Sequence, residues 1–370
     1  MVVKEQITGY LFILPSVAII SLFGFFPIAY AIYMSARRWR VVKGAFIGLD
    51  NYEKALGNLT GALLFAIGFL LLYLAYEAFN ASTKRGGIWK WIFRVLGLLF
   101  IAGAIYLIRD GWGRMLAEGD DDFLMSLPRT VFYALGTVPL ELGLALVLAY
   151  ILFQKIRGQE LFRMLYFLPY ITPVVAAAVV FRTIFSPRET SLANTALQSI
   201  GLPPQEWLFE SQPFTHLLGL ENLQGLAAGP SLALVSIIIF GVWTYVGYNT
   251  VIFLAGLGGI PSELYEAAEI DGANKFQLFR YITVPLLSPI TFYLGLIAFI
   301  GTFKAFNHIY VMRVPSAQGT VDVASVEIFD TFYKANQYGY AAAEAILLFM
   351  IILALTFAQN RIFGRRVFYG

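Results

Sequence analysis

The residues with the clearest chemical pattern lie in one polar segment, Pro261–Pro289, between two long apolar stretches. Pro261 is typical of a helix start, and Glu263 would lie in the first turn, where the helix dipole favours a carboxylate. Gly272 permits a sharp turn, and a second short helix follows, which Pro285 is expected to end. The segment predicts two short helices around a glycine hinge, a form suited to docking in a groove of a soluble partner.

The faces of these two predicted helices differ in chemistry. Apolar stripes are expected at Leu264, Ala267 and Ala268 in the first helix and at Phe276, Phe279 and Ile282 in the second, with Glu266 and Glu269 on a neighbouring face of the first. The competing interpretation is an amphipathic connector that lies on the bilayer surface. Such helices are usually rich in Lys and Arg, whereas this segment has no basic residue before Lys275.

Composition excludes several kinds of active site. The chain has no cysteine and two histidines, which excludes thiolate sites and a histidine-rich metal centre. It has no GxxxxGK[ST] phosphate loop, so it is not itself expected to be an ATPase. The net charge of +3 is small and the basic residues are scattered, so nucleic-acid binding is not expected.

The remaining sequence indicates a membrane protein. Of the 370 residues, 59% are hydrophobic and 13% are charged, and the mean hydropathy is +0.71. A hydrocarbon core of about 30 Å needs about 20 apolar residues as a helix, and a lipid solvent favours helices over open strands. We therefore predict an all-α polytopic protein with about eight spans: Thr8–Met34, Thr60–Phe79, Trp91–Ile108, Thr130–Phe153, Tyr166–Phe185, Leu232–Leu257, Leu287–Phe306 and Ala345–Phe363.

The distribution of Lys and Arg gives an orientation. Three basic groups fall on one side if both termini are cytoplasmic, whereas the cations that follow the first span dissent. The first apolar run is too long for a signal peptide and is expected to be an uncleaved membrane helix. The three agreeing groups are Lys84, Arg85 and Lys90; Lys155, Arg157 and Arg163; and Arg361, Arg365 and Arg366; the dissenting cations are Arg37, Arg38, Arg40 and Lys43.

The polar segment resembles the EAA loop of permeases in binding-protein-dependent ABC importers. The pattern is EAA, three residues, Gly, nine residues, then I-x-x-P. Here it is formed by Glu266, Ala267, Ala268, Gly272, Ile282 and Pro285, with Asp271 extending it to DGA. The resemblance implies that this loop couples the permease to a partner ATPase, with Glu266, Asp271 and Gly272 as the principal coupling residues.

Further stretches resemble the MalF-like carbohydrate permeases. FIGLDNY at Phe46–Tyr52 and GVWTYVGYNTVIFLAGL at Gly241–Leu257 are examples, and the resemblance covers Thr8–Tyr52 and about Pro128–Gly370. It implies a MalF/MetI-like core over 119–370 that contains the loop 261–289, preceded by a first span and external segment over 1–57. Residues 58–118 are interpreted as an inserted hairpin, either a lipid-facing brace or a docking site for an accessory subunit.

The resemblance also implies an assembly in a prokaryotic plasma membrane. Its other members would be a second homologous permease, a cytoplasmic ATPase dimer and an extracytoplasmic sugar-binding protein. No cofactor is expected in this chain, since ATP and Mg²⁺ would bind the ATPase. The family's Thr-x-Gly-Gly-Pro pattern is replaced here by MRVPSAQGT at Met312–Thr320, which weakens any transfer of external contacts or of the particular sugar.

A sugar pathway needs aromatic faces and hydrogen-bonding groups inside the membrane. A polar side chain in a span usually faces protein or water, so each candidate could line a pathway or could simply contact a neighbouring helix or the interface. The candidates are Trp243, Tyr245, Tyr248 and Asn249 in the sixth span, Glu141 in the fourth, and Lys304 near the external end of the seventh.

Three alternatives stay open at this point. An ion-coupled secondary transporter would need intramembrane carboxylates or broken helices in two repeats, and only Glu141 is a plausible ion ligand. A membrane enzyme would show clustered His, Asp or Glu at one membrane face. A permease of the same architecture for glycerol phosphate, a polyamine or another small polar solute is the nearest rival, although phosphate recognition would favour Arg or Lys in the spans.

Overall fold

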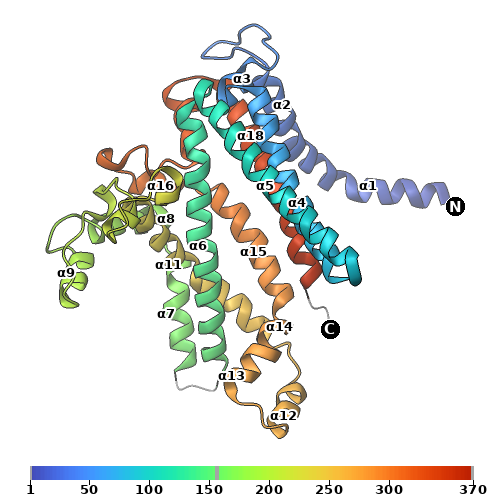
Figure 1. Cartoon of the computed structure of the whole chain (residues 1–370), viewed down its shortest axis with the longest axis vertical. Coiled ribbons are helices and arrows are strands. Elements are labelled where there is room, and N and C mark those ends of the chain that lie inside the picture. The colour runs from blue at the N-terminus through green and yellow to red at the C-terminus, as the bar shows by residue number, and fades with distance from the viewer. Residues whose placement is uncertain (1, 155–157, 368–370) are drawn as a thin grey trace. The chain divides into compact units, whose positions relative to one another are not determined.

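The fold is almost entirely helical in the computed structural model, which describes residues 2–154 and 158–367 (Figure 1). Apart from two isolated β-bridges, these residues form no strand. The α-helices are α1 (Val2–Ile20), α2 (Phe26–Ser35), α3 (Asp50–Leu56), α4 (Leu59–Thr83), α5 (Gly87–Glu118), α6 (Asp121–Phe153), α7 (Gln159–Ile171), α8 (Val174–Ile184), α9 (Leu192–Ser199), α10 (Phe214–Leu217), α11 (Leu232–Leu257), α12 (Ser262–Ile270), α13 (Lys275–Leu278), α14 (Val284–Leu286), α15 (Ser288–Phe303), α16 (Asn307–Met312), α17 (Ala324–Phe329) and α18 (Tyr338–Phe363).

Short π-helical and 3-10 turns connect some of these helices. The π turns are Ser21–Phe25, Phe279–Thr283 and Asp330–Lys334, and the 3-10 turns are Trp207–Phe209, Gly225–Ala228, Pro315–Ala317 and Gly364–Arg366. The chain divides into two compact units, residues 1–124 with 327–350, and residues 125–326 with 351–370. Each unit is described by itself below.

The expected polytopic all-α fold is confirmed. Six helical segments of the described chain are long and apolar enough to cross a membrane: Thr8–Ser35, α4, α5, α6, α11 and α18. Two further spans are broken pairs, which raises the number to as many as eight. The predicted span Tyr166–Phe185 is therefore wrong as a single straight helix. The predicted span Leu287–Phe306 contains the single helix α15, and the second break lies at its first residue.

Proline and local backbone geometry account for both breaks. Glu160–Ile171 and Val174–Ile184 meet at 96°, because Thr172 is extended (ψ 135°) before Pro173, a residue that disfavours a helical neighbour. Lys275–Leu286 and Ser288–Phe303 meet at 63° at Leu287, whose ψ is 0°. Pro285 does not end the second short helix as expected, since it lies inside α14, directly after the π turn.

In the first unit, α4 and α5 form an antiparallel hairpin with a seam of small residues (Figure 1). Buried small residues recur every seven positions: Gly61, Gly68, Ala75 and Ser82 in α4, and Gly97, Ala104 and Gly111 in α5. A Cβ on Gly111 would lie 2.6 Å from the Gly61 carbonyl oxygen, so the two backbones are in close contact. Small residues allow such approach where lipid gives no hydrophobic drive to association.

The two ends of this hairpin meet at a narrow neck. A Cβ on Gly57, whose φ is +67°, would lie 2.2 Å from the Gly119 backbone nitrogen. The Asn58 side-chain amide donates to Glu118 across the same point, at 3.3 Å. Because the ends lie together, the hairpin joins the rest of its unit through a few residues; the predicted boundary of 58–118 itself stays a prediction.

In the second unit, α11 is the central helix. Of the most apolar stretch of α11, 56% is buried inside the structure, whereas 0% of the corresponding stretch of Thr8–Ser35 is buried. One apolar cluster packs α11 against α6, α8 and α16 and includes Phe240, Ile237 and Ile309. A second cluster, with Phe253 and Leu287, joins the other end of α11 to α6 and α15. The polar segment Pro261–Pro289 therefore follows the central helix α11 and leads into α15.

Candidate functional site

The first short helix of the polar loop, α12, stands out from the packed helices. None of its residues is buried. It ends at Ile270 and is capped by Asp271, whose amide donates to the Ala267 carbonyl at 3.1 Å, and Gly272 follows with φ +85°. No atom lies within 4 Å of where a Cβ on Gly272 would be, so backbone conformation and not crowding explains the glycine.

The second short segment starts with a complete capping box. The Asn274 side chain accepts from the Gln277 amide at 2.9 Å, and the Gln277 side chain accepts from the Asn274 amide at 2.7 Å. In α13 itself, Leu278 is buried while Phe276 is 72% exposed. The predicted stripe through Phe276, Phe279 and Ile282 is thus wrong at Phe276.

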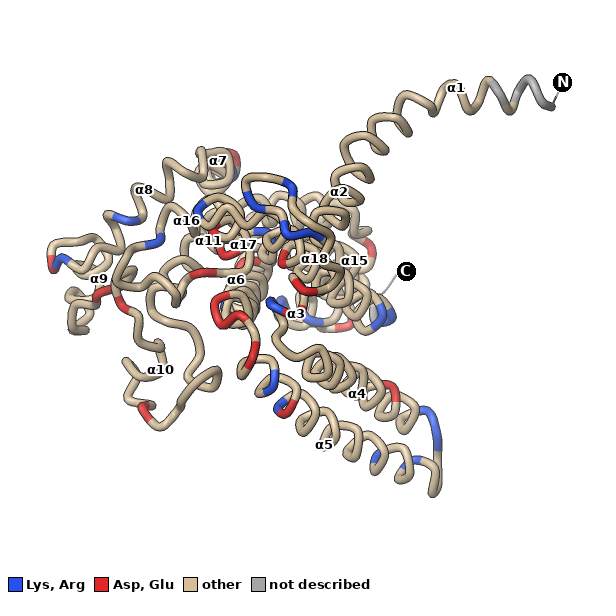
Figure 2. Tube along the Cα trace, turned by 90° about the horizontal axis from the view of Figure 1, so that it is seen from above, with Lys and Arg blue, Asp and Glu red and all other residues tan. Residues whose placement is uncertain are grey.

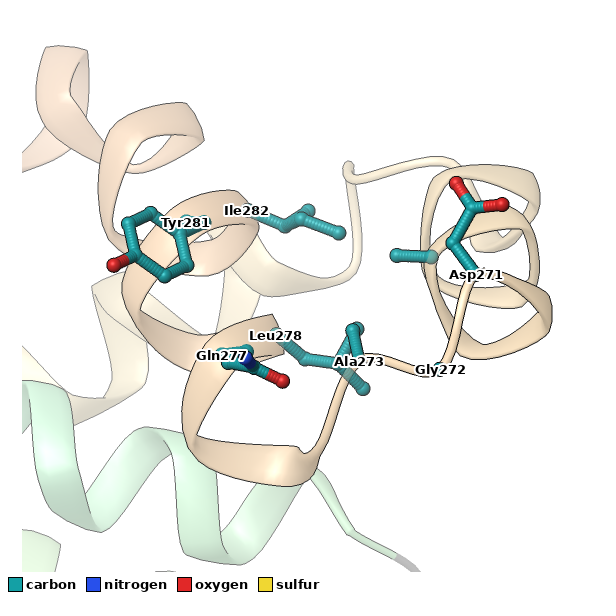
Figure 3. Close-up of a pocket in the computed structure, with 8 residues that line it drawn as sticks. Asp271, Gly272, Ala273, Gln277, Leu278, Tyr281 and Ile282 are labelled. Carbon is teal, nitrogen blue, oxygen red and sulfur yellow. The ribbon is translucent and has the colours of Figure 1, made fainter.

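A hydrogen bond ties the two short helices together. The hydroxyls of Tyr265 in α12 and Thr283 in the π turn lie 3.0 Å apart, and Thr283 is fully buried. Between the helices lies a cavity of ≈ 260 Å³, toward which Leu278 and Ile282 point from one side (Figure 3). It is lined by Ala268, Asp271, Gly272, Ala273, Gln277, Leu278, Tyr281 and Ile282. The two helices therefore form one stiff element with a concave face.

The predicted coupling residues lie at the surface of this element. Glu266, Ala267, Asp271, Gly272 and Pro285 are exposed, and Ala268 is half-buried at the cavity. Within the described chain, neither Glu266 nor Asp271 makes an ion pair or a side-chain hydrogen bond. The loop thus presents free carboxylates beside exposed apolar side chains such as Ile270, which is 87% exposed.

The predicted pathway residues separate into two groups. Trp243 and Tyr245 are partly exposed on α11, where Tyr245 and Tyr248 face Tyr170 of α7 with ring centroids 6.1 and 4.5 Å away. Glu141 and Asn249 are instead buried, with exposures of 3% and 4%, and their side chains lie within hydrogen-bonding reach of one another.

The contact between Glu141 and Asn249 joins α6 to α11. The pathway role and the helix–helix role of these two residues both stay predictions. One oxygen of the Glu141 carboxyl, Oε2, has no hydrogen-bond partner among the described residues. Lys304 is exposed just after α15.

Sequence reasoning missed a buried polar pair in the second unit. His308 of α16 lies with its Nε2 2.7 Å from the Tyr133 hydroxyl of α6. Burial lowers the pKa of His308 to about 4, so the ring is neutral near pH 7. The signal was a run of polar residues three or four positions apart in the fourth span: Thr130, Tyr133, Thr137 and Glu141.

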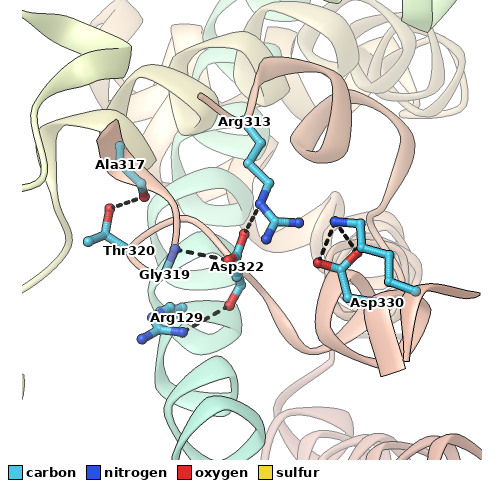
Figure 4. A network of polar contacts seen from close by, with 8 residues as sticks. Arg129, Arg313, Ala317, Gly319, Thr320, Asp322 and Asp330 are labelled. Carbon is cyan, nitrogen blue, oxygen red and sulfur yellow. Dashed lines mark hydrogen bonds and ion pairs between the residues drawn. The ribbon is translucent and has the colours of Figure 1, made fainter. Parts of the chain in front are cut away.

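It also missed a polar network at the end of α6 (Figure 4). The Asp322 carboxylate pairs with Arg313 Nε at 2.9 Å and accepts from the Gly319 amide at 2.9 Å. Arg129 of α6 donates to the Asp322 carbonyl at 3.4 Å, and the Ala324 amide donates to the Thr130 hydroxyl at 2.9 Å. The network fixes the 313–324 segment, which contains all of the divergent MRVPSAQGT stretch except its first residue, to the membrane helix.

Comparison with known proteins shows which family has this architecture. The family model described as "Binding-protein-dependent transport system inner membrane component" matches residues 141–369, well over half of the chain. The arabinooligosaccharides transport system permease protein AraP of Bacillus subtilis is 31% identical over 256 residues, which cover 69% of this chain and 76% of AraP. The trehalose/maltose transport system permease protein MalF of Thermococcus litoralis is 30% identical over 241 residues, 65% of this chain and 75% of MalF.

A solved structure shares the fold. In the bacterial alginate ABC transporter in complex with an alginate pentasaccharide-bound periplasmic protein, one chain superposes with a TM-score of 0.58 at 22% identity. The match covers 68% of this chain and 81% of that one. The matched family model spans α11, the polar loop and α15, the elements that build the site described above. The chain belongs to the family of inner-membrane components of binding-protein-dependent transport systems.

Proposed function

We propose that the chain is the permease subunit of an ATP-driven importer that moves a sugar from an extracytoplasmic binding protein into the cytoplasm by alternating access. The observation that carries the proposal is the free acidic surface of the two-helix loop element, which is shaped to fit a soluble partner. The sugar class is supported by the names of AraP and MalF, which refer to arabinooligosaccharides and to trehalose and maltose.

The proposed partner at this loop is a cytoplasmic ATPase dimer, which would carry ATP and Mg²⁺. Glu266 and Asp271 would pair with basic groups of the ATPase, while Ala267 and Ala268 allow close approach. Gly272 sets the angle between the two short helices, and Pro285 lies where the element joins the helix that leads to α15. Because the Tyr265–Thr283 bond stiffens the element, movement of the ATPase would reach the membrane helices.

The physical basis of transport would be a population shift. ATP must stabilise one state of the complex more than the other, since a ligand that binds both states equally shifts nothing. The breaks at Thr172 and Leu287 give the second unit two places where helix direction changes. A second homologous permease is proposed as a further partner, and the apolar span Thr8–Ser35, which is unburied in the described chain, offers surface for it.

The sugar pathway is proposed to involve the aromatic side of α11. Trp243, Tyr245 and Tyr248 present partly exposed rings that suit the apolar faces of a sugar. Glu141 and Asn249 would not contact the sugar; they would support the aromatic side chains by holding α6 against α11. Lys304 is proposed to lie at the external mouth.

The proposed orientation has both termini in the cytoplasm of a prokaryotic cell, with the chain in the plasma membrane. Lys and Arg usually gather on the cytoplasmic side, whereas in this orientation the four cations after the first span lie on the external side. Two of them are held on an aromatic face, since Arg37 lies 4.6 Å and Lys43 5.2 Å from the Tyr33 ring centroid. The attraction between each cation and the aromatic ring partly stabilises these charges at their observed positions.

Reconstitution of the full complex in nanodiscs tests the proposal. The ATPase rate is measured with and without sugar-loaded binding protein for the wild type, Glu266→Lys and Gly272→Pro. We expect stimulation in the wild type and its loss in both variants, because one reverses a docking charge and the other forbids φ +85°. Gly201→Pro is the matched control, since Gly201 has φ +79° and open space around it on a different loop.

The outcomes separate the parts of the proposal. Stimulation that survives in both loop variants would sink the coupling role of the loop. Equal loss in the Gly201→Pro control would show that general damage, and not coupling, explains the effect. If no ATPase associates with the chain, the ion-coupled transporter becomes the better hypothesis.

A further inference from the structure

The turn between α4 and α5 carries a purely basic surface. Lys84 and Arg85 lie in the turn, and Lys90 and Arg94 follow in the first two turns of α5. No Asp or Glu occurs between Glu77 and Asp110. Figure 2 shows this end of the hairpin in blue. We call these four residues the basic tip.

Aromatic rings hold two of these cations in place. The Arg85 guanidinium lies 4.5 Å from the Phe93 ring centroid, and that of Arg94 lies 5.3 Å from the Trp91 ring centroid. Trp91 is itself 63% exposed and Trp89 is 57% exposed. Exposed tryptophans at the end of long apolar helices are typical of the lipid headgroup level.

In the part of the chain that the structure describes, the basic tip stands apart from acidic side chains. Among the described residues, none of its four cations forms an ion pair. The positions around the turn are open, since no atom lies within 4 Å of where a Cβ on Gly86 or Gly87 would be. The close seam between α4 and α5 fixes the two helices together, so the tip presents its charges from a stiff support.

We propose that the basic tip binds the headgroups of anionic phospholipids and so anchors the hairpin in one leaflet. Charge complementarity favours an anion, and the flanking tryptophans place that anion at the membrane surface and not in bulk water. In the orientation proposed above this is the cytoplasmic leaflet. The inference goes beyond transport and does not depend on the sugar or on the ATPase.

Native mass spectrometry of the purified full chain tests the proposal. Phosphatidylglycerol and phosphatidylcholine with the same acyl chains are titrated against the wild type and the double variant Lys84→Gln/Arg85→Gln. A cation near an anionic surface contributes roughly five-fold in affinity, so we expect a loss of about 25-fold for phosphatidylglycerol alone. The control is Arg109→Gln/Arg114→Gln, which removes two charges from the other end of α5.

Several results would overturn the proposal. These are equal affinity of the wild type for the two lipids, an equal loss in the control, or displacement of the lipid by inorganic phosphate at similar concentration, which would indicate a free-anion site. A second measurement needs no variant. Stabilisation of the wild type against heat by phosphatidylglycerol must weaken as NaCl rises, because salt screens exposed charges; stabilisation that salt does not change would also refute the inference.

Discussion

Substitution of Gly247 by alanine should force α7 and α11 apart. Gly247 is buried in α11, and a Cβ there would lie 1.8 Å from the Tyr166 carbonyl oxygen and 3.1 Å from the Phe167 Cα. Real Cβ contacts essentially never fall below 3.0 Å, so α7 would have to move by about 1.2 Å. The obstacle is backbone, which no change of rotamer can relieve.

Gly247→Ala is expected to lower the free energy of unfolding by about 3 kcal/mol, at the upper end of the range for overpacked sites. The shift would also disturb the stacked rings of Tyr170 and Tyr248, whose centroids are 4.5 Å apart. The assay is the thermal unfolding midpoint of the purified chain, followed by size-exclusion chromatography after heating. Gly247→Ala should lower the midpoint by several degrees relative to the wild type.

Gly143→Ala in α6 is the matched control for this prediction. Gly143 is also helical, but no atom lies within 4 Å of where its Cβ would be. Because alanine is intrinsically preferred over glycine in a helix by about 1 kcal/mol, this variant should keep or slightly raise the midpoint. Equal midpoints for the two variants would refute the conclusion that α7 and α11 meet backbone to backbone at Gly247.

Three further predictions concern single groups. Asp322→Asn should destabilise the chain by about 3–5 kcal/mol, because it removes the carboxylate charge that pairs with the buried Arg313 guanidinium. Arg114→Gln, in an exposed pair, should cost about 1 kcal/mol or less, and similar unfolding midpoints for the two variants would contradict this. Burial lowers the pKa of His308 from 6.5 to about 4, so the unfolded chain takes up a proton at a higher pH than the folded chain does. The free energy of unfolding should therefore fall by up to about 3 kcal/mol as the pH drops from 6.5 to 4. His308→Gln should flatten that part of the stability profile, and an unchanged profile would contradict the assignment to His308. Tyr265→Phe should cost about 1 kcal/mol of stability and weaken ATPase stimulation, because it removes the bond to Thr283. Tyr106→Phe, at a 69% exposed site in α5, should change neither, and equal effects of the two variants would remove the stiffening role of the bond.

Much of the architecture could be predicted from sequence because a membrane imposes local rules. Apolar length and helical hydrogen bonding decide a span without reference to distant residues. The six unbroken spans follow this rule, although α6 begins at Asp121 and not near Thr130. The turn at Gly272 was predictable for the same reason, since its positive φ is a local demand on residue type.

Local rules were insufficient at the two broken spans. Pro173 and Pro285 were visible in the sequence, but a proline in an apolar run is compatible with a kink, a break or an undisturbed first turn. The structure shows a different outcome at each proline. At Pro173 the helix breaks at 96°, whereas Pro285 lies within a helix and the break falls two residues later, at Leu287.

What the sequence determined by itself is the set of apolar spans, the hinge and the free carboxylates of the loop. Only the tertiary structure decided which buried polar groups meet, because such partners lie far apart along the chain. Tyr133 and His308 are 175 residues apart, yet their side chains lie 2.7 Å from one another. Inside a membrane each buried polar group needs a partner, but its identity is set by the packing of helices and not by the neighbouring sequence.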